Sequence, residues 1–143
     1  LSRWSAFPIG LAMVAEVADG VLRPHASGEV GRPLQGLRSI VLSAFDGYPV
    51  PSALGEQGWR HARSELDQRL LRFGQEPPKR SFEVPDAYAR EYFDLMPIHE
   101  KLRARDFSTM HNYLKLTLCN IHDELTRRME APALIASLGR MQA

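Results

Sequence analysis

The sequence predicts an all-α fold, a compact bundle of five or six helices with one long central helix near 107–130. Apolar residues recur at steps of three and four along most of the chain, as they do on one face of an α-helix. Prolines and glycines divide these stretches into pieces of helix length. Alternating runs of β-branched residues, which would indicate strands, are too short to count.

The first predicted helix covers residues 5–22, with Pro8 in its first turn, where a missing N–H costs no hydrogen bond. Pro8 and Gly10 interrupt the apolar run, and Glu16 and Asp19 lie where a signal peptide would need small residues. A core helix therefore explains this segment better than a signal peptide does. Its expected buried face is a stripe at alternating four- and three-residue steps: Phe7, Leu11, Val14, Ala18 and Val21.

Two more helices are predicted at 33–45 and 52–73. The turn signal Asp46-Gly47 ends the first of them, and Gly74 is a natural C-terminal cap for the second. The second helix is the clearer one, because its apolar residues form a single stripe. That stripe, expected to be buried, is Trp59, Ala62, Leu66, Leu70 and Phe73.

Residues 74–85 contain three prolines and predict an extended connection that crosses the surface. The segments on either side of it would each be marginal alone, so we expect a single helical domain, residues 1–143. A domain of this length can bury about two-thirds of its unfolded surface. The one cysteine, Cys119, excludes a disulfide framework and favours a reducing, cytoplasmic location.

The C-terminal part of the chain begins with a helix at Asp86, which is followed by a short helix over 97–104. Asp106 can then cap the longest helix, about 107–130, and a short helix over 133–141 comes last. The longest helix carries a heptad-like apolar seam. The seam consists of Phe107, His111, Leu114, Leu118, Ile121 and Leu125.

Charges are balanced along the whole chain. Eighteen Lys and Arg stand against seventeen Asp and Glu, a net charge of +1, and no segment carries a strong excess of either sign. Non-specific binding to nucleic acids and to membrane surfaces depends on clustered basic residues, so the sequence disfavours both. Opposite charges four residues apart, such as Arg63–Asp67 and Glu65–Arg69, predict ion pairs on solvated helix faces.

The sequence contains no recognisable catalytic set. It lacks the Gly-x-Ser-x-Gly elbow, the phosphate-binding loop and the dinucleotide-binding motif. Cys119 lies in the middle of a predicted helix, away from a helix N-terminus that would activate its thiol. We therefore predict no catalytic residues and no cofactor, and we favour a protein that is not an enzyme.

The alternative enzyme is a metal-assisted hydrolase that uses His122 and Asp123 together with His99. His111 lies eleven residues before His122, about 16 Å away along a helix, which is too far for both to bind one metal ion. The spacing of these residues does not require a metal site. Metal binding by His99, His122 and Asp123 therefore stays an alternative to a polar helix face.

The second alternative is a helix-turn-helix-like nucleic-acid binder formed by residues 33–73. The connection between its two helices is longer than the usual three- or four-residue turn. Acidic residues, among them Glu56, also dilute its positive charge. Its basic side chains, with one histidine, are Arg60, His61, Arg63, Arg69 and Arg72.

The favoured function is a non-enzymatic protein-interaction or regulatory module that acts as a homo-oligomer or bound to a protein partner. Tyrosine, phenylalanine and methionine are concentrated within residues 88–113, and these residue types are enriched at interfaces as well as common in cores. The seam near 107–125 could pair within the chain or across a two-fold axis. The predicted partner-binding residues are Tyr88, Tyr92, Phe93, Met96, Met110 and Tyr113.

Overall fold

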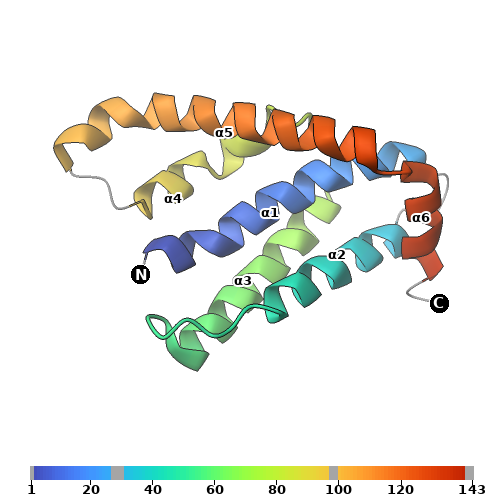
Figure 1. Ribbon diagram of the computed structural model, residues 1–143, viewed down its shortest axis with the longest axis horizontal. Coiled ribbons are helices and arrows are strands. Elements are labelled where there is room, and N and C mark those ends of the chain that lie inside the picture. Colours follow the sequence, from blue (N-terminus) through green and yellow to red (C-terminus); the bar gives the residue numbers. More distant parts are fainter. Residues whose placement is uncertain (1, 27–30, 97–99, 141–143) are drawn as a thin grey trace.

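The computed structural model describes residues 2–26, 31–96 and 100–140 (Figure 1). These residues are mainly helical and include no strand, so the predicted all-α bundle is confirmed. The α-helices are α1 (Ser2–Leu22), α2 (Gly31–Asp46), α3 (Gly55–Gly74), α4 (Ala89–Asp94), α5 (Glu100–Arg128) and α6 (Ala131–Arg140). Two short 3₁₀ helices are η1 (Arg23–His25), after α1, and η2 (Val84–Ala87), before α4.

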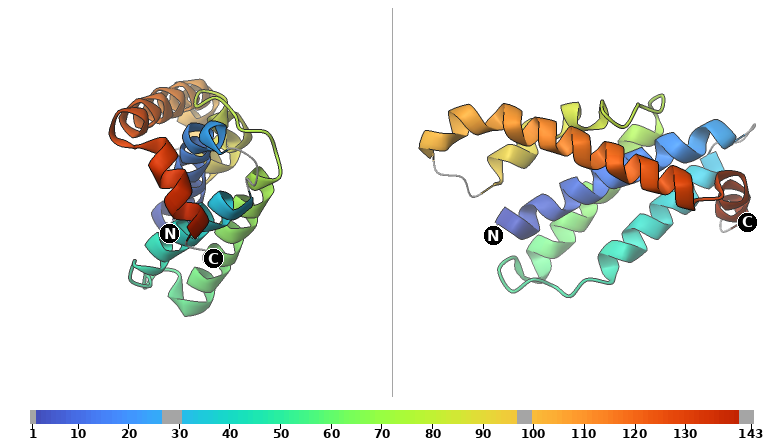
Figure 2. Two further views of the ribbon diagram at one scale, coloured as in Figure 1. Left: turned by 90° about the vertical axis from the view of Figure 1, so that its right-hand side faces the viewer. Right: turned by 45° about the horizontal axis from the view of Figure 1, so that its top comes forward.

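The helix α1 contacts each of the other α-helices described. It crosses the molecule between α5 on one side and α2 and α3 on the other (Figures 1 and 2). The predicted long helix is present as α5, which packs on α1, α4 and η2. At the far end α6 packs mainly on α2, close to the C-terminus. The helix α1 is therefore the central element of the bundle.

Aromatic rings from α1, α2 and α3 build one end of the core. Phe45 is fully buried and stacks on Trp59, with ring centroids 4.2 Å apart. Phe7 lies 5.8 Å from the ring of Phe45, and Trp4 meets Trp59 edge-on at 6.0 Å. The stripe predicted for α3 is confirmed, because each of its members is buried: Trp59, Ala62, Leu66, Leu70 and Phe73.

The seam predicted for the longest helix also packs inward. Leu114 and Leu118 are buried against the main core, and Met110 is buried beside them. Other members of the seam are half-buried, because α5 lies at the edge of the bundle and only one of its faces is covered. These half-buried members are Phe107, His111, Ile121 and Leu125.

The helices α1 and α5 begin three and seven residues earlier than the sequence predicted. The helix α1 begins at Ser2, so Pro8 lies inside it rather than in its first turn, and the carbonyl four residues earlier loses its helical donor. The helix α5 begins at Glu100, so Asp106 lies within it and does not cap it. Residues 103–107 contain neither proline nor glycine, and continuing a helix through them costs less than starting a new one.

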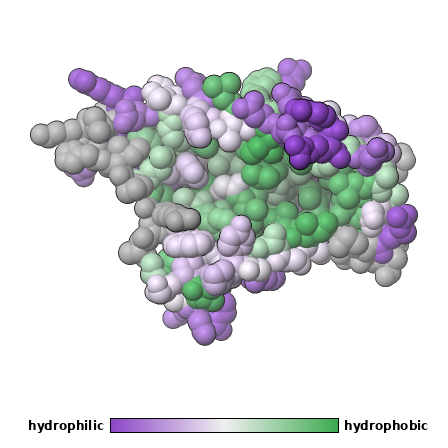
Figure 3. Space-filling view, viewed as in Figure 1, coloured by the Kyte–Doolittle hydropathy of each residue, from purple (hydrophilic) through white to green (hydrophobic). Residues whose placement is uncertain are grey.

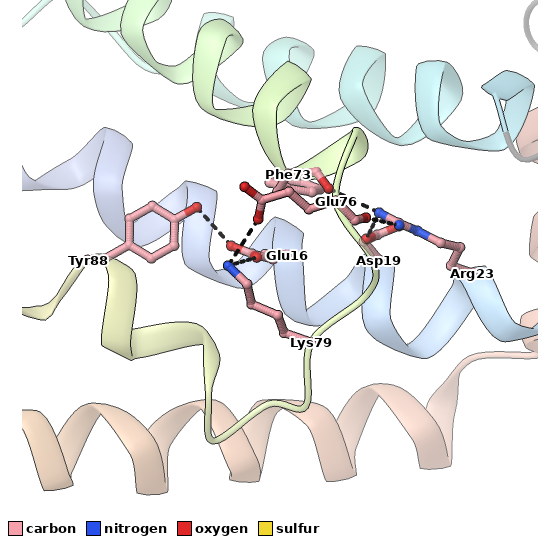
Figure 4. Close-up of polar contacts among 7 residues, drawn as sticks. All are labelled: Glu16, Asp19, Arg23, Phe73, Glu76, Lys79 and Tyr88. Carbon is pink, nitrogen blue, oxygen red and sulfur yellow. Dashed lines mark hydrogen bonds and ion pairs between the residues drawn. The ribbon is translucent and has the colours of Figure 1, made fainter.

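The non-helical connection 75–83, which we call the strap, passes over α1 on its way from α3 to η2 (Figure 4). It comes so close that a Cβ atom added to Gly20 would lie 3.0 Å from the carbonyl oxygen of Lys79. The missing side chain of Gly20 lets the strap approach α1 this closely, and a Cβ atom here would require the strap to move by a few tenths of an ångström. The strap in turn brings the side chain of Lys79 to α1.

Gly36 allows an even closer contact, between α2 and α6. A Cβ atom there would lie 2.7 Å from the carbonyl oxygen of Leu138, so Gly36→Ala must displace α6. We expect this change to lower the free energy of unfolding by about 1–3 kcal/mol, as measured by urea denaturation. The matched control is Gly139→Ala in α6, where a Cβ meets nothing within 4 Å and the better helix propensity of alanine should stabilise the protein by up to about 1 kcal/mol. Equal effects of the two changes would contradict this account.

Candidate functional site

Three of the predicted partner-binding residues lie inside the bundle. Tyr88, Phe93 and Met110 are 7 %, 2 % and 8 % exposed and belong to the main core. Phe93 meets the ring of Phe107 edge-on at 5.4 Å, which fixes α4 on α5. These residues share the composition of an interface but contact the interior of their own chain.

The other three predicted residues are accessible. Tyr92 and Met96 are half-buried near α4, whereas Tyr113 on α5 is 67 % exposed. Leu116, also on α5, is 66 % exposed, although the sequence did not single it out. Of these three residues, Tyr92 lines a groove together with residues of α1.

The face that the sequence predicted as buried on α1 is its least covered one. Phe7, Leu11, Val14 and Ala18 are only half-buried, and Val21 alone of the stripe is buried. Other sides of α1 are buried instead, because α3 and α5 pack there. The fully covered apolar residues include Ile9, Ala12, Met13, Ala15 and Val17. The prediction was thus wrong about which side of this helix is the most deeply buried.

Three residues of this stripe, Phe7, Leu11 and Val14, line a shallow groove of about 370 Å³, which we call the α1 groove. None of the residues that line it is charged, and Tyr92 of α4 forms one wall. A Cβ atom added to Gly10 would meet nothing within 4 Å, so this glycine opens directly onto the groove. Figure 3 shows hydrophobic surface gathered over α1 between α5 and α2, with a hydrophilic edge toward the C-terminal end of α5. The residues lining the groove are Ala6, Phe7, Gly10, Leu11, Val14 and Tyr92.

A second feature of α1 is a pair of buried carboxylates, Glu16 and Asp19, which are 3 % and 1 % exposed. Tyr88 donates a hydrogen bond of 2.8 Å from its hydroxyl to Oε2 of Glu16, and Nζ of Lys79 lies 3.2 Å from Oε1 of the same residue (Figure 4). Burial raises the pKa of the Tyr88 hydroxyl, and the adjacent Glu16 raises it further. Burial lowers the pKa of Lys79, but the carboxylates of Glu16 and Glu76 outweigh that effect and raise it overall.

The second carboxylate, that of Asp19, forms a salt bridge with Arg23. Its Nε and Nη2 donate to the two oxygens of Asp19 at 3.0 and 2.5 Å, and its guanidinium also donates to the backbone carbonyls of Phe73 and Glu76 (Figure 4). Burial raises the pKa of Asp19, and the hydrogen bond from Arg23 counteracts this only in part. The arginine thereby ties the end of α1 to the end of α3 and to the strap.

The chain has no significant match among protein-family models, curated proteins or solved structures. Over Trp4–His25 the chain is long and apolar enough to span a membrane, but half of its most apolar window is buried inside the fold, as in the core helix of a soluble protein. The cytoplasmic location stays a prediction.

The metal alternative gains no supporting geometry within residues 2–26, 31–96 and 100–140. These residues contain no group of three or more histidine, cysteine or acidic side chains placed to hold a metal ion. Nδ1 of His122 lies 3.4 Å from Oδ1 of Asp123, and His99 lies outside the described residues. His111 instead contacts Asp86, with 2.8 Å between Nε2 and Oδ1.

The predicted helix-turn-helix-like segment corresponds to α2, α3 and the connection between them. Asp67 holds Arg38 at 2.5 and 2.8 Å, and Asp46 holds Arg63 at 2.6 and 2.8 Å. The hydrogen bonds from these arginines lower the pKa of both aspartates. The predicted pairs Arg63–Asp67 and Glu65–Arg69 do not form, because the arginines reach carboxylates on other elements. Arg69, for example, pairs with Glu91 of α4.

Proposed function

We propose that this protein is a non-enzymatic interaction module that acts as a homodimer, in which two copies pack their α1 grooves together. The observation that carries the proposal is the stripe Phe7, Leu11, Val14 and Ala18, which is apolar throughout and only half-buried. A helix that is apolar on all sides is normally buried on all sides. Covering this face would remove further apolar surface from water, worth about 25 cal/mol per Å².

The stripe is complementary to a second copy of itself. Its 4–3–4 spacing is the one with which helices pack along a common seam. In an antiparallel pair with the two-fold axis between Gly10 and Leu11, each leucine faces the glycine of the other copy, and Phe7 faces Val14. A small residue thus meets a large one at the centre, and each of these contacts occurs twice, once in each direction, as the two-fold symmetry of an isologous contact requires. No charged residue lines the groove, so no repulsion opposes this pairing.

The test is a substitution that fills the groove without disturbing the single copy. Gly10→Gln places a polar side chain in open space, where a Cβ meets nothing within 4 Å, so the bundle should fold as before. The matched control is Gly139→Gln, at a glycine in α6 that is equally unobstructed. Analytical ultracentrifugation over a range of micromolar concentrations measures the mass of each protein.

We expect the unchanged protein and Gly139→Gln to shift from one copy to two as concentration rises. Gly10→Gln should dimerise at least about tenfold more weakly, a difference of about 1.4 kcal/mol or more. A protein that stays monomeric at all concentrations would overturn the proposal. So would a dimer that Gly10→Gln leaves intact, because its interface would then lie elsewhere.

A further inference from the structure

A cleft of about 140 Å³ lies over the buried carboxylate of Glu16, apart from the α1 groove. Its walls come from the end of α3, the strap and the segment from η2 to α4, and Glu16 of α1 also lines it. The volume is room for about five water molecules, or for one small organic molecule. The charged residues that line it are Glu16, Arg69, Arg72, Glu76, Lys79 and Glu91.

The carboxylates of Glu16 and Glu76 can accept further hydrogen bonds in the cleft. Glu16 and Glu76 share the ammonium of Lys79, at 3.2 and 3.3 Å. A carboxylate offers about four lone-pair positions, and the contacts of Glu16 with Lys79 and Tyr88 occupy two of them. Two carboxylates that share one cation still favour a second ammonium group nearby.

The arginines on the α3 side of the cleft can donate further hydrogen bonds. Arg69 and Arg72 are three residues apart on this helix, and both line the cleft. Arg69 contacts Glu91 through Nη2 alone and lies 5.8 Å from the centre of the Tyr88 ring. Within the part of the chain that the structure describes, Arg72 has no carboxylate within ion-pair distance. A guanidinium carries five donors in a fork that matches a carboxylate.

We propose that this cleft binds a small zwitterion with the chemistry of a free α-amino acid. Its carboxylate would be held by Arg72 and Arg69, and its ammonium by Glu16 and Glu76. The three cations and three carboxylates of the cleft sum to zero charge, which suits a ligand of no net charge. A simple anion would gain the arginines but would face three carboxylates, and a simple cation would face the opposite repulsion.

Isothermal titration calorimetry tests the proposal with the free α-amino acids one at a time, glycine being the minimal zwitterion. The probes for each half of the ligand are acetate and methylamine, and inorganic phosphate tests for a plain anion site. The variant is Arg72→Gln, at an exposed position that should not affect folding. The matched control is Arg60→Gln, an exposed arginine of the same helix outside the cleft.

We expect at least one amino acid to bind with a dissociation constant of about 1 mM or tighter. Acetate, methylamine and phosphate should bind at least about tenfold more weakly than the best amino acid. The affinity for that amino acid should fall about tenfold or more in Arg72→Gln and should be unchanged in Arg60→Gln. The proposal is overturned if no amino acid binds at about 10 mM, or if acetate or phosphate binds as well as the best amino acid. Equal losses in the two arginine variants would also overturn it.

Discussion

Replacing Phe45 with alanine should lower the free energy of unfolding by about 3–5 kcal/mol, a large part of the stability of a domain of this size. Phe45 is fully buried, and its ring stacks on Trp59 at 4.2 Å and lies 5.8 Å from Phe7. Its removal opens a cavity where α1, α2 and α3 meet, and helices cannot close such a cavity without disturbing their other contacts. Urea denaturation followed by circular dichroism measures the effect.

The matched control for this change is Phe82→Ala in the strap. Phe82 is 43 % exposed, so the same truncation there should change the free energy of unfolding by about 0.5 kcal/mol or less. Similar losses at both positions would contradict the view that the aromatic cluster is the centre of the core.

Replacing Arg23 with alanine should cost about 3–5 kcal/mol at neutral pH, because it leaves the buried carboxylate of Asp19 without its cation. The loss should shrink as the pH falls. Burial raises the pKa of Asp19 above its ordinary value of 3.8, so the folded state binds this proton more tightly than the unfolded chain does. The ionised carboxylate therefore opposes folding as the pH rises through the raised pKa. Without Arg23 the ionised carboxylate of Asp19 lowers the free energy of unfolding further. Protonation of Asp19 at low pH removes this destabilisation.

The measurement compares Arg23→Ala with the unchanged protein by urea denaturation at neutral pH and near pH 4. Acid also weakens the ion pairs of Asp46 and Asp67, but it does so in both proteins, so this effect cancels in the difference. The control is Arg127→Ala, whose partner Glu124 is a surface residue and whose loss should be small at both pH values. If Arg23→Ala lowers the free energy of unfolding by the same amount at both pH values, Asp19 is excluded as the cause.

The sequence was sufficient to predict the all-α fold and part of the core. The α3 stripe from Trp59 to Phe73 was correct because a regular apolar spacing on an amphipathic helix leaves only one side to bury. The same rule did not identify the buried side of α1, where apolar residues occur all round. On such a helix the neighbours decide which face is covered, and neighbours are not encoded in local spacing.

The candidate sites were harder to predict for a related reason. Glu16 and Asp19 were visible as acids within an apolar run, and buried acids need partners. Their partners Lys79 and Tyr88 come from distant segments, and no local pattern connects those segments to α1. Aromatic composition, by contrast, directed attention to Tyr88 and Phe93, which are core residues, because cores and interfaces use the same side chains.

Several of the groups that contact Glu16 and Arg23 are synthesised long after α1 itself. The tyrosine that contacts Glu16 comes 72 positions after it, and the backbone carbonyls that receive Arg23 come 50 and 53 positions after that arginine. A ribosome adds about 5–20 residues per second, so the first helix waits about 4–14 seconds for Tyr88. Until then the carboxylate of Glu16 lacks its tyrosine donor, and burying it without that hydrogen bond would cost free energy, whereas Asp19 already has its partner Arg23 four residues away. The helix α1 is thus made before the tyrosine that contacts Glu16, and this hydrogen bond can form only after Tyr88 has been synthesised.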